Sequence, residues 1–148
     1  MTSIQLLAAS MLGSAALIAG AAIAEPGSDG GRKFSTTLTG AAEVPGPGDT
    51  DGSGTATVTV NAGQKRVCYE LEVANIAPAT MAHIHIAPAG TAGPIVVHLQ
   101  APTDGDSSGC VTVSAELAKA ILKVPTTYYV NVHNADFPAG ATRGQLAK

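Results

Sequence analysis

The residues of this sequence best suited to chemistry are its four histidines, which all lie in the second half of the 148-residue chain. His83 and His85 form a His-x-His pair in a stretch where they alternate with Ile84 and Ile86. Alternate side chains of a β-strand share a face, so this pair places two imidazoles on one face, about 7 Å apart at Cα. Two such imidazoles suit one copper or zinc ion if a third ligand arrives from another strand.

A third imidazole on a second strand completes this candidate site. In the segment 128–133 two valines alternate with Tyr129, Asn131 and His133, so these three side chains are expected to face away from the core. His133 is the natural third ligand, because it takes an outward position near a turn. The predicted metal ligands are therefore His83, His85 and His133.

Outward-facing histidines have a second interpretation, in which no cofactor is required. They can be surface polar residues, or they can bond loop carbonyls and anchor the loops. His85 and His133 each run into a Pro-Ala-Gly turn that would offer such carbonyls. His98 is left out of the predicted metal site because nothing else marks its segment.

The segments that must position these residues are short and rich in Val, Thr, Ile and Tyr, with Gly, Pro and Asp clusters between them. This spacing is typical of an all-β sandwich or barrel. One helix is predicted at about 114–123, capped by Ser114 and ended before Pro125. Eight strands are predicted, at about residues 34–42, 54–61, 66–74, 81–86, 94–100, 109–114, 127–134 and 142–147.

The two cysteines, Cys68 and Cys110, fall on the outer faces of their predicted strands. An even number of cysteines in an exported chain indicates one disulfide, across neighbouring strands or to a nearby loop. The alternative is two unrelated free thiols.

The first 24 residues indicate export. They carry no charged side chain and end in Ala22-Ile23-Ala24, the small-x-small pattern that signal peptidase cleaves. The alternative is an uncleaved membrane anchor, since the apolar run is nearly long enough to span a bilayer. Residues 25–33 are interpreted as a flexible linker. The expected location is secreted or extracytoplasmic, with the periplasm or the cell surface as alternatives.

Charge excludes some partners and suggests one contact. The net charge is −3 and no basic stripe is present, so we expect no nucleic-acid partner, and no membrane partner after signal cleavage. Glu43 and Arg143 lie in otherwise uncharged surroundings near the two ends of the domain. We predict a bidentate ion pair between them, and the alternative is two solvated charges.

Three motifs, in order, resemble the CHRD (chordin-type) domain family. Residues 38–45 are similar to its opening Leu-Thr-Gly-x-x-Glu-Val-Pro, residues 82–90 to its central His-Ile-His-Gly-Pro-Ala, and residues 129–146 to its closing Tyr-Val-Asn-Val-His with Arg-Gly-Gln. Ile86 stands where the family usually has Gly, and Ala141-Thr142 where it usually has Glu-Ile. If that Glu were a ligand or a base, this chain would lack it.

The resemblance implies a single-domain, exported, bacterial-type member with the domain at 34–147. The expected fold is an antiparallel Greek-key sandwich or barrel, immunoglobulin-like or similar to Cu/Zn superoxide dismutase, whose copper-site strand also carries a His-x-His. The expected function is a structural or interaction module, with an unknown protein or a cell-surface polymer as partner. The alternative is a mononuclear copper- or zinc-binding protein.

No enzyme is predicted. The dinuclear dismutase site uses six His and one Asp, and four histidines cannot build it. A Gly-x-Ser-x-Gly string occurs at residues 105–109, but it runs from a predicted turn into a predicted strand and so lacks the strand-to-helix turn of a nucleophile motif. No phosphate-binding glycine motif precedes a helix. Bridged cysteines would leave no thiolate nucleophile.

Overall fold

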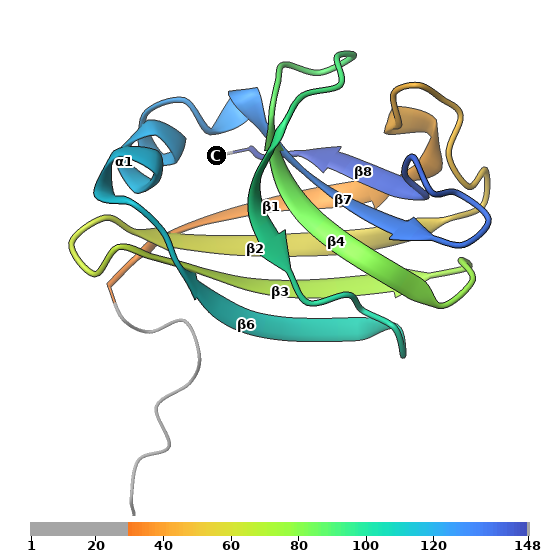
Figure 1. The fold of residues 1–148 in the computed structure, drawn as a ribbon, viewed down its shortest axis with the longest axis horizontal. Coiled ribbons are helices and arrows are strands. Elements are labelled where there is room, and N and C mark those ends of the chain that lie inside the picture. Colours follow the sequence, from red (N-terminus) through yellow and green to blue (C-terminus); the bar gives the residue numbers. More distant parts are fainter. Residues whose placement is uncertain (1–29, 148) are drawn as a thin grey trace, which may run out of the picture.

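The computed structural model describes residues 30–147, which form eight strands, one α-helix and two short 3-10 helices (Figure 1). The α-helix is α1 (Ala115–Lys123), and the 3-10 helices are η1 (Gly40–Ala42) and η2 (Pro125–Thr127). The strands are β1 (Arg32–Thr39), β2 (Ser53–Asn61), β3 (Arg66–Ala74), β4 (Ala79–Ile86), β5 (Ile95–Leu99), β6 (Asp106–Thr112), β7 (Tyr128–Asn134) and β8 (Thr142–Gln145).

All eight predicted strands and the predicted helix are present, with differences at the ends. The first strand begins at Arg32, inside the segment expected to be linker, because Arg32 and Lys33 continue the ladder with β2. The same strand ends before η1, which replaces its predicted last three residues. The predicted signal peptide, 1–24, and residues 25–29 of the predicted linker lie outside the described residues.

The strands form one antiparallel sheet in the order β5-β4-β7-β8-β1-β2-β3-β6, which curls into a nearly closed barrel. The two end strands, β5 and β6, meet without a ladder between them. Gln100, directly after β5, links that strand to both β6 and β3: its carbonyl accepts from the Ser107 hydroxyl of β6 at 2.8 Å, and its N–H donates to the Tyr69 hydroxyl of β3 at 2.9 Å. With β7 beside β4, the run from β4 to β7 has Greek-key connectivity, as predicted.

The barrel interior is the hydrophobic core, and period-two alternation fills it. Valines, isoleucines and leucines at alternate strand positions are almost completely buried, together with Phe34 and Leu38 of β1. Helix α1 lies at one end of the barrel and buries Ala118 and Ile121. The Ser114 hydroxyl caps it by accepting a hydrogen bond from the Leu117 N–H at 3.0 Å, as the sequence predicts.

The predicted disulfide is confirmed. Cys68 on β3 stands opposite Cys110 on β6 in the ladder, and the two side chains are bonded. The bridge therefore ties the end strand β6 to its one ladder neighbour. Among residues 30–147, no helix is long and apolar enough to cross a membrane.

Candidate metal centre

The outer face of β4, β7 and β8 carries a block of functional side chains, arranged in three rows by the strand register. Antiparallel pairing places each residue of β7 directly opposite one residue of β4. Residues 129–132 of β7 also lie opposite residues of β8 on the other side. The rows are Met81–His133, then His83–Asn131–Arg143, then His85–Tyr129–Gln145. On β4 and β7 these residues alternate with core residues, as predicted from the sequence; the core residues are Ala82, Ile84, Val130 and Val132.

All three predicted ligands are nevertheless buried. His83 is 5% exposed, His85 8% and His133 7%. They lie outside the hydrophobic core cluster, so their predicted orientation away from the core is confirmed. The alternative of surface polar residues is wrong, because loops cover this part of the barrel's outer face.

The loop between β4 and β5 forms much of this cover, and β7 and β8 hold it in place. The backbone N–H of Gly93 donates to the Tyr129 hydroxyl at 3.1 Å. The side chain of Arg143 donates to the carbonyl of Thr91 at 2.7 Å, and that of Gln145 donates to another loop carbonyl at 2.8 Å. The loop is therefore anchored on the block by side chains of the block itself.

Two of the histidines also anchor loops, and they use the same ring atom to do so. Nδ1 of His85 donates to the carbonyl of Gly93 at 2.8 Å, and Nδ1 of His133 donates to the carbonyl of Pro138 at 3.1 Å. The predicted loop-anchor role is thus observed. In the neutral rings it makes Nε2 the lone-pair nitrogen that could bind an ion, which is the usual arrangement of metal-ligating histidines.

One nitrogen from each of His83, His85 and His133 lies within 4.8 Å of the other two. Nδ1 of His83 lies 3.1 Å from Nε2 of His133, and Nε2 of His85 is buried without a hydrogen-bond partner. Nitrogens around a tetrahedral zinc ion with bonds of about 2.0–2.1 Å are separated by roughly 3.3 Å. A small inward movement of the His85 ring would therefore give the spacing of one shared ion.

Asn131 brings an oxygen to the same point. Its Oδ1 lies 3.1 Å from Nε2 of His133. Because Nδ1 of His133 carries its proton toward the Pro138 carbonyl, Nε2 of the neutral ring presents a lone pair to that oxygen. Nε2 of His133 and Oδ1 of Asn131 are therefore two buried acceptors that face each other, and Nδ1 of His83 is placed to donate to the nitrogen. Nε2 of His85 lies beside them without a partner, so the site favours a cation.

Burial keeps the imidazoles of His83 and His133 neutral. Burial, and to a smaller extent the neighbouring His133, His85 and His98, together lower the pKa of His83 to about 4. Burial also lowers the pKa of His133, against the opposing effect of its bond to the Pro138 carbonyl. Neutral imidazole is the form that binds a metal ion, so these two ligands are ready at neutral pH.

His98 packs beside His83 but is not part of the group of three ligands. It lies on β5 opposite His83, with ring centres 5.0 Å apart, and its side chain is exposed. Its nitrogens do not belong to the group of atoms within 4.8 Å.

The structure buries both Glu43 and Arg143 but does not form the predicted bidentate ion pair. The Nε and Nη1 atoms of Arg143 have no hydrogen-bond partner, and its Nη2 donates to the carbonyl of Thr91. Its guanidinium carbon lies 3.3 Å from the centre of the Tyr129 ring, which stacks on His85 at 4.7 Å. The loop carbonyl and the aromatic face, rather than the carboxylate, hold this cation.

Glu43 remains close enough to feel the charge of Arg143. Burial raises the pKa of Glu43 to about 7, and the positive charge of Arg143 is the main opposing effect. The Val44 backbone and the Asn131 side chain oppose the increase by hydrogen bonding. A Cβ at Gly140 would overlap the Glu43 carboxyl group, and Gly140 has φ +145°, so this close approach requires glycine.

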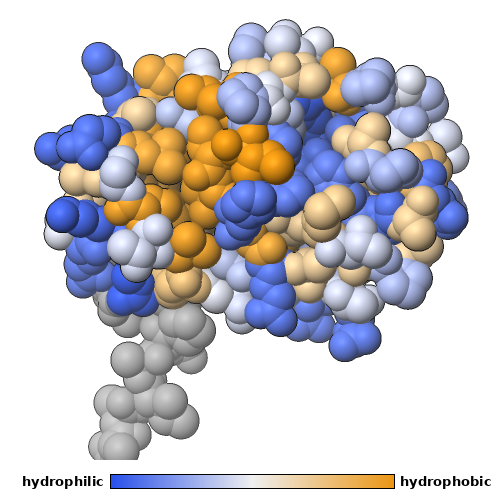
Figure 2. Space-filling view, in the orientation of Figure 1, coloured by the Kyte–Doolittle hydropathy of each residue, from blue (hydrophilic) through white to orange (hydrophobic). Residues whose placement is uncertain are grey.

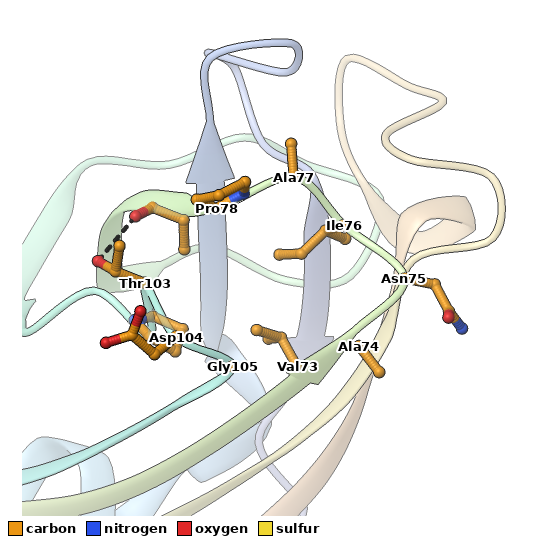
Figure 3. Close-up of a pocket in the computed structure, with 11 residues that line it drawn as sticks. Val73, Ala74, Asn75, Ile76, Ala77, Pro78, Thr103, Asp104 and Gly105 are labelled. Carbon is orange, nitrogen blue, oxygen red and sulfur yellow. Dashed lines mark hydrogen bonds between the residues drawn. The ribbon is translucent and has the colours of Figure 1, made fainter.

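A separate depression of about 300 Å³ lies beside the ends of β3 and β4, between segments 73–79 and 102–105 (Figure 3). Asp104 is the one charged residue that lines it. The Thr103 hydroxyl is bonded to the carbonyl of Ala79 at 3.0 Å. Its lining resembles an ordinary gap between loops more than a chemical site.

Asn131, Tyr129 and Met81 were not assigned to the site from the sequence. The alternation Tyr129-x-Asn131-x-His133 was the available signal for Asn131 and Tyr129, since it puts them on the same face as His133. For Met81 the signal was its spacing of two residues from His83. The loops that cover this face could not be inferred from alternation, which reports only the side of a strand.

The fold and the block together define a Greek-key β-barrel domain with three buried imidazoles under loops on its outer face. The chain belongs to the CHRD domain family, whose family model matches residues 34–146. No curated protein and no solved structure matches it.

Proposed function

We propose that this chain is an exported metal-binding CHRD module in which His83, His85 and His133 hold one copper or zinc ion. The observation that carries the proposal is the convergence of three buried imidazoles, with one nitrogen of each within 4.8 Å of the other two. Nε2 of His85 has no partner, and Nε2 of His133 faces Nδ1 of His83 and Oδ1 of Asn131, each at 3.1 Å. Buried acceptors of this kind are costly unless a donor or a cation satisfies them.

The residues around the imidazoles would orient and tune the site. The carbonyls of Gly93 and Pro138 fix which nitrogen of His85 and His133 carries the proton. The stack of Tyr129 on His85 restricts rotation of that ring. A bound ion would tie β4 to β7 and to the covering loops, and the proposal includes no catalytic step.

The disulfide and the N-terminal sequence support export. A cross-strand bridge persists in oxidising compartments outside the cytoplasm, and the uncharged first 24 residues end in a signal-peptidase pattern. We propose no nucleic-acid partner and, after signal cleavage, no membrane partner. The net charge of −3 argues against binding to nucleic acid.

The second candidate is an interaction module that binds a protein or a cell-surface polymer. Figure 2 shows apolar residues gathered on the face between α1 and the adjoining parts of β4 and β5. Ile86 is 38% exposed, Ile95 42% and Val124 42%. Contiguous exposed apolar surface is typical of binding sites, and a module of this kind could also hold a structural ion.

The metal content of the protein, purified from its natural secretion route, tests the main proposal. We expect about one equivalent of copper or zinc, and we expect His85→Ala to weaken binding by at least tenfold, since removal of even a second-layer partner costs roughly 10–100-fold. His98→Ala is the matched control and should leave binding unchanged. Metal far below one equivalent, unaffected by His85→Ala, would contradict the proposal.

A further inference from the structure

Met81 is the one methionine within the described residues, and the strand register places it beside the candidate metal centre. It lies on β4 two residues before His83, so it shares a face with His83 and His85. It stands directly opposite His133 in the ladder between β4 and β7. Met81 therefore belongs to the same block of side chains as the three imidazoles.

Packing does not account for a methionine at this position. Its neighbour Ala82 and the next inward residue, Ile84, are completely buried in the core, while Met81 is 45% exposed. A large apolar side chain on the outer face of a strand gains little from burial there. The Met81 side chain therefore takes no part in the hydrophobic core.

We propose that Met81 adds a thioether ligand to the three imidazoles and thereby makes the site prefer copper(I) to zinc. Directly opposed residues of an antiparallel pair have Cβ atoms about 4.5–5.5 Å apart, and methionine has three rotatable bonds with which to reach across. Thioether sulfur is a soft ligand that selects copper(I), whereas zinc is satisfied by imidazole alone. This inference rests on the proposed metal site and specifies its ion.

Two other side chains near the site do not offer this selectivity. His98 would add a fourth imidazole, but its nitrogens lie outside the group formed by the other three. Asn131 would add an amide oxygen, which suits harder cations. Of the side chains in the three rows, only Met81 carries a soft ligand atom.

The test compares the copper(I) and zinc(II) affinities of the wild-type chain with those of Met81→Leu. Each affinity is measured by competition with a chromophoric chelator, under anaerobic reducing conditions mild enough to keep the disulfide for copper(I). Leucine has nearly the volume of methionine and removes only the sulfur, so the fold should be kept. The matched control is Ile86→Leu, which changes an exposed apolar residue of the same strand on the other face.

We expect Met81→Leu to weaken copper(I) binding at least tenfold and to leave zinc binding within twofold, while Ile86→Leu changes neither. X-ray absorption of the copper(I) protein should show one sulfur neighbour that disappears in Met81→Leu. Equal effects of Met81→Leu on both ions, or no effect on copper(I), would overturn the role of Met81 and leave the three-histidine site intact. A wild-type chain that takes up neither ion would overturn the site and this inference together.

Discussion

The chemistry of single residues in this protein is set by burial on the outer side of a β-barrel. Period-two alternation places His83 and His85 on that side. Hydrogen bonds from His85 to the Gly93 carbonyl and from His133 to the Pro138 carbonyl hold two loops over it. Burial then lowers the pKa of His83 and of His133, which keeps these two imidazoles neutral, and it raises the pKa of Glu43 to about 7. Burial therefore has two effects here: it gives neutral imidazoles that can bind an ion, and it gives Glu43 an unusually high pKa.

Glu43 gives a pH-dependent prediction at this scale. Its pKa is about 7 in the folded chain against an ordinary 4.5. Between pH 4.5 and pH 7 the folded state therefore keeps a proton on Glu43 that the unfolded state has lost. The contribution of Glu43 to stability is therefore present below about pH 4.5 and is lost as the pH rises through 7. Glu43→Gln cannot titrate and should not show this decline.

The measurement is urea unfolding of the metal-free wild-type and Glu43→Gln chains at pH 4.5 and pH 8. The free energy of unfolding of the variant, relative to wild type, should increase between these pH values by up to about 3 kcal/mol. A difference between the two chains that stays constant across this range would show that Glu43 has an ordinary pKa.

The elements explain which parts of the site could be read from the sequence. Alternation along 82–86 and 128–133 correctly predicted the faces of the histidines, because a strand has only two faces. It could not predict their burial, since residues 87–94 have no period and their path depends on bonds to Tyr129, Arg143 and Gln145. The predicted Glu43–Arg143 contact was wrong in geometry for a similar reason: a loop carbonyl and an aromatic ring hold Arg143 instead.

At the scale of elements, the disulfide should stabilise the end strand β6. That strand has a ladder with β3 alone, and the Cys68–Cys110 bridge crosses this ladder with a sequence separation of 42. Closing a loop of this length contributes about 3–4 kcal/mol in the chain-entropy model. The double variant Cys68→Ser/Cys110→Ser should lose a comparable free energy of unfolding in urea at neutral pH.

Reduced wild-type protein is the control and should match the double variant. A loss below about 1 kcal/mol in the double variant would mean that the ladder and the Tyr69–Gln100–Ser107 bonds hold β6 without the bridge.

The whole molecule brings together residues that are far apart in the sequence. His83 and His133 are 50 positions apart, and they become neighbours because the Greek-key connection sets β7 beside β4 rather than beside β6. Strand number, strand type and the family could be predicted from patterns and motifs. The neighbour of each strand could not be predicted from alternation, because the pattern of apolar residues is the same for many strand orders.

The central claim is that one ion binds among three imidazoles on the outer face of the barrel. Its most direct test is a crystal structure of the metal-loaded protein with anomalous diffraction recorded on both sides of the copper and zinc absorption edges. We predict one anomalous peak bonded to Nε2 of His85, Nε2 of His133 and a ring nitrogen of His83. A fully loaded crystal whose peak lies elsewhere, with these three rings keeping only their hydrogen bonds, would contradict it.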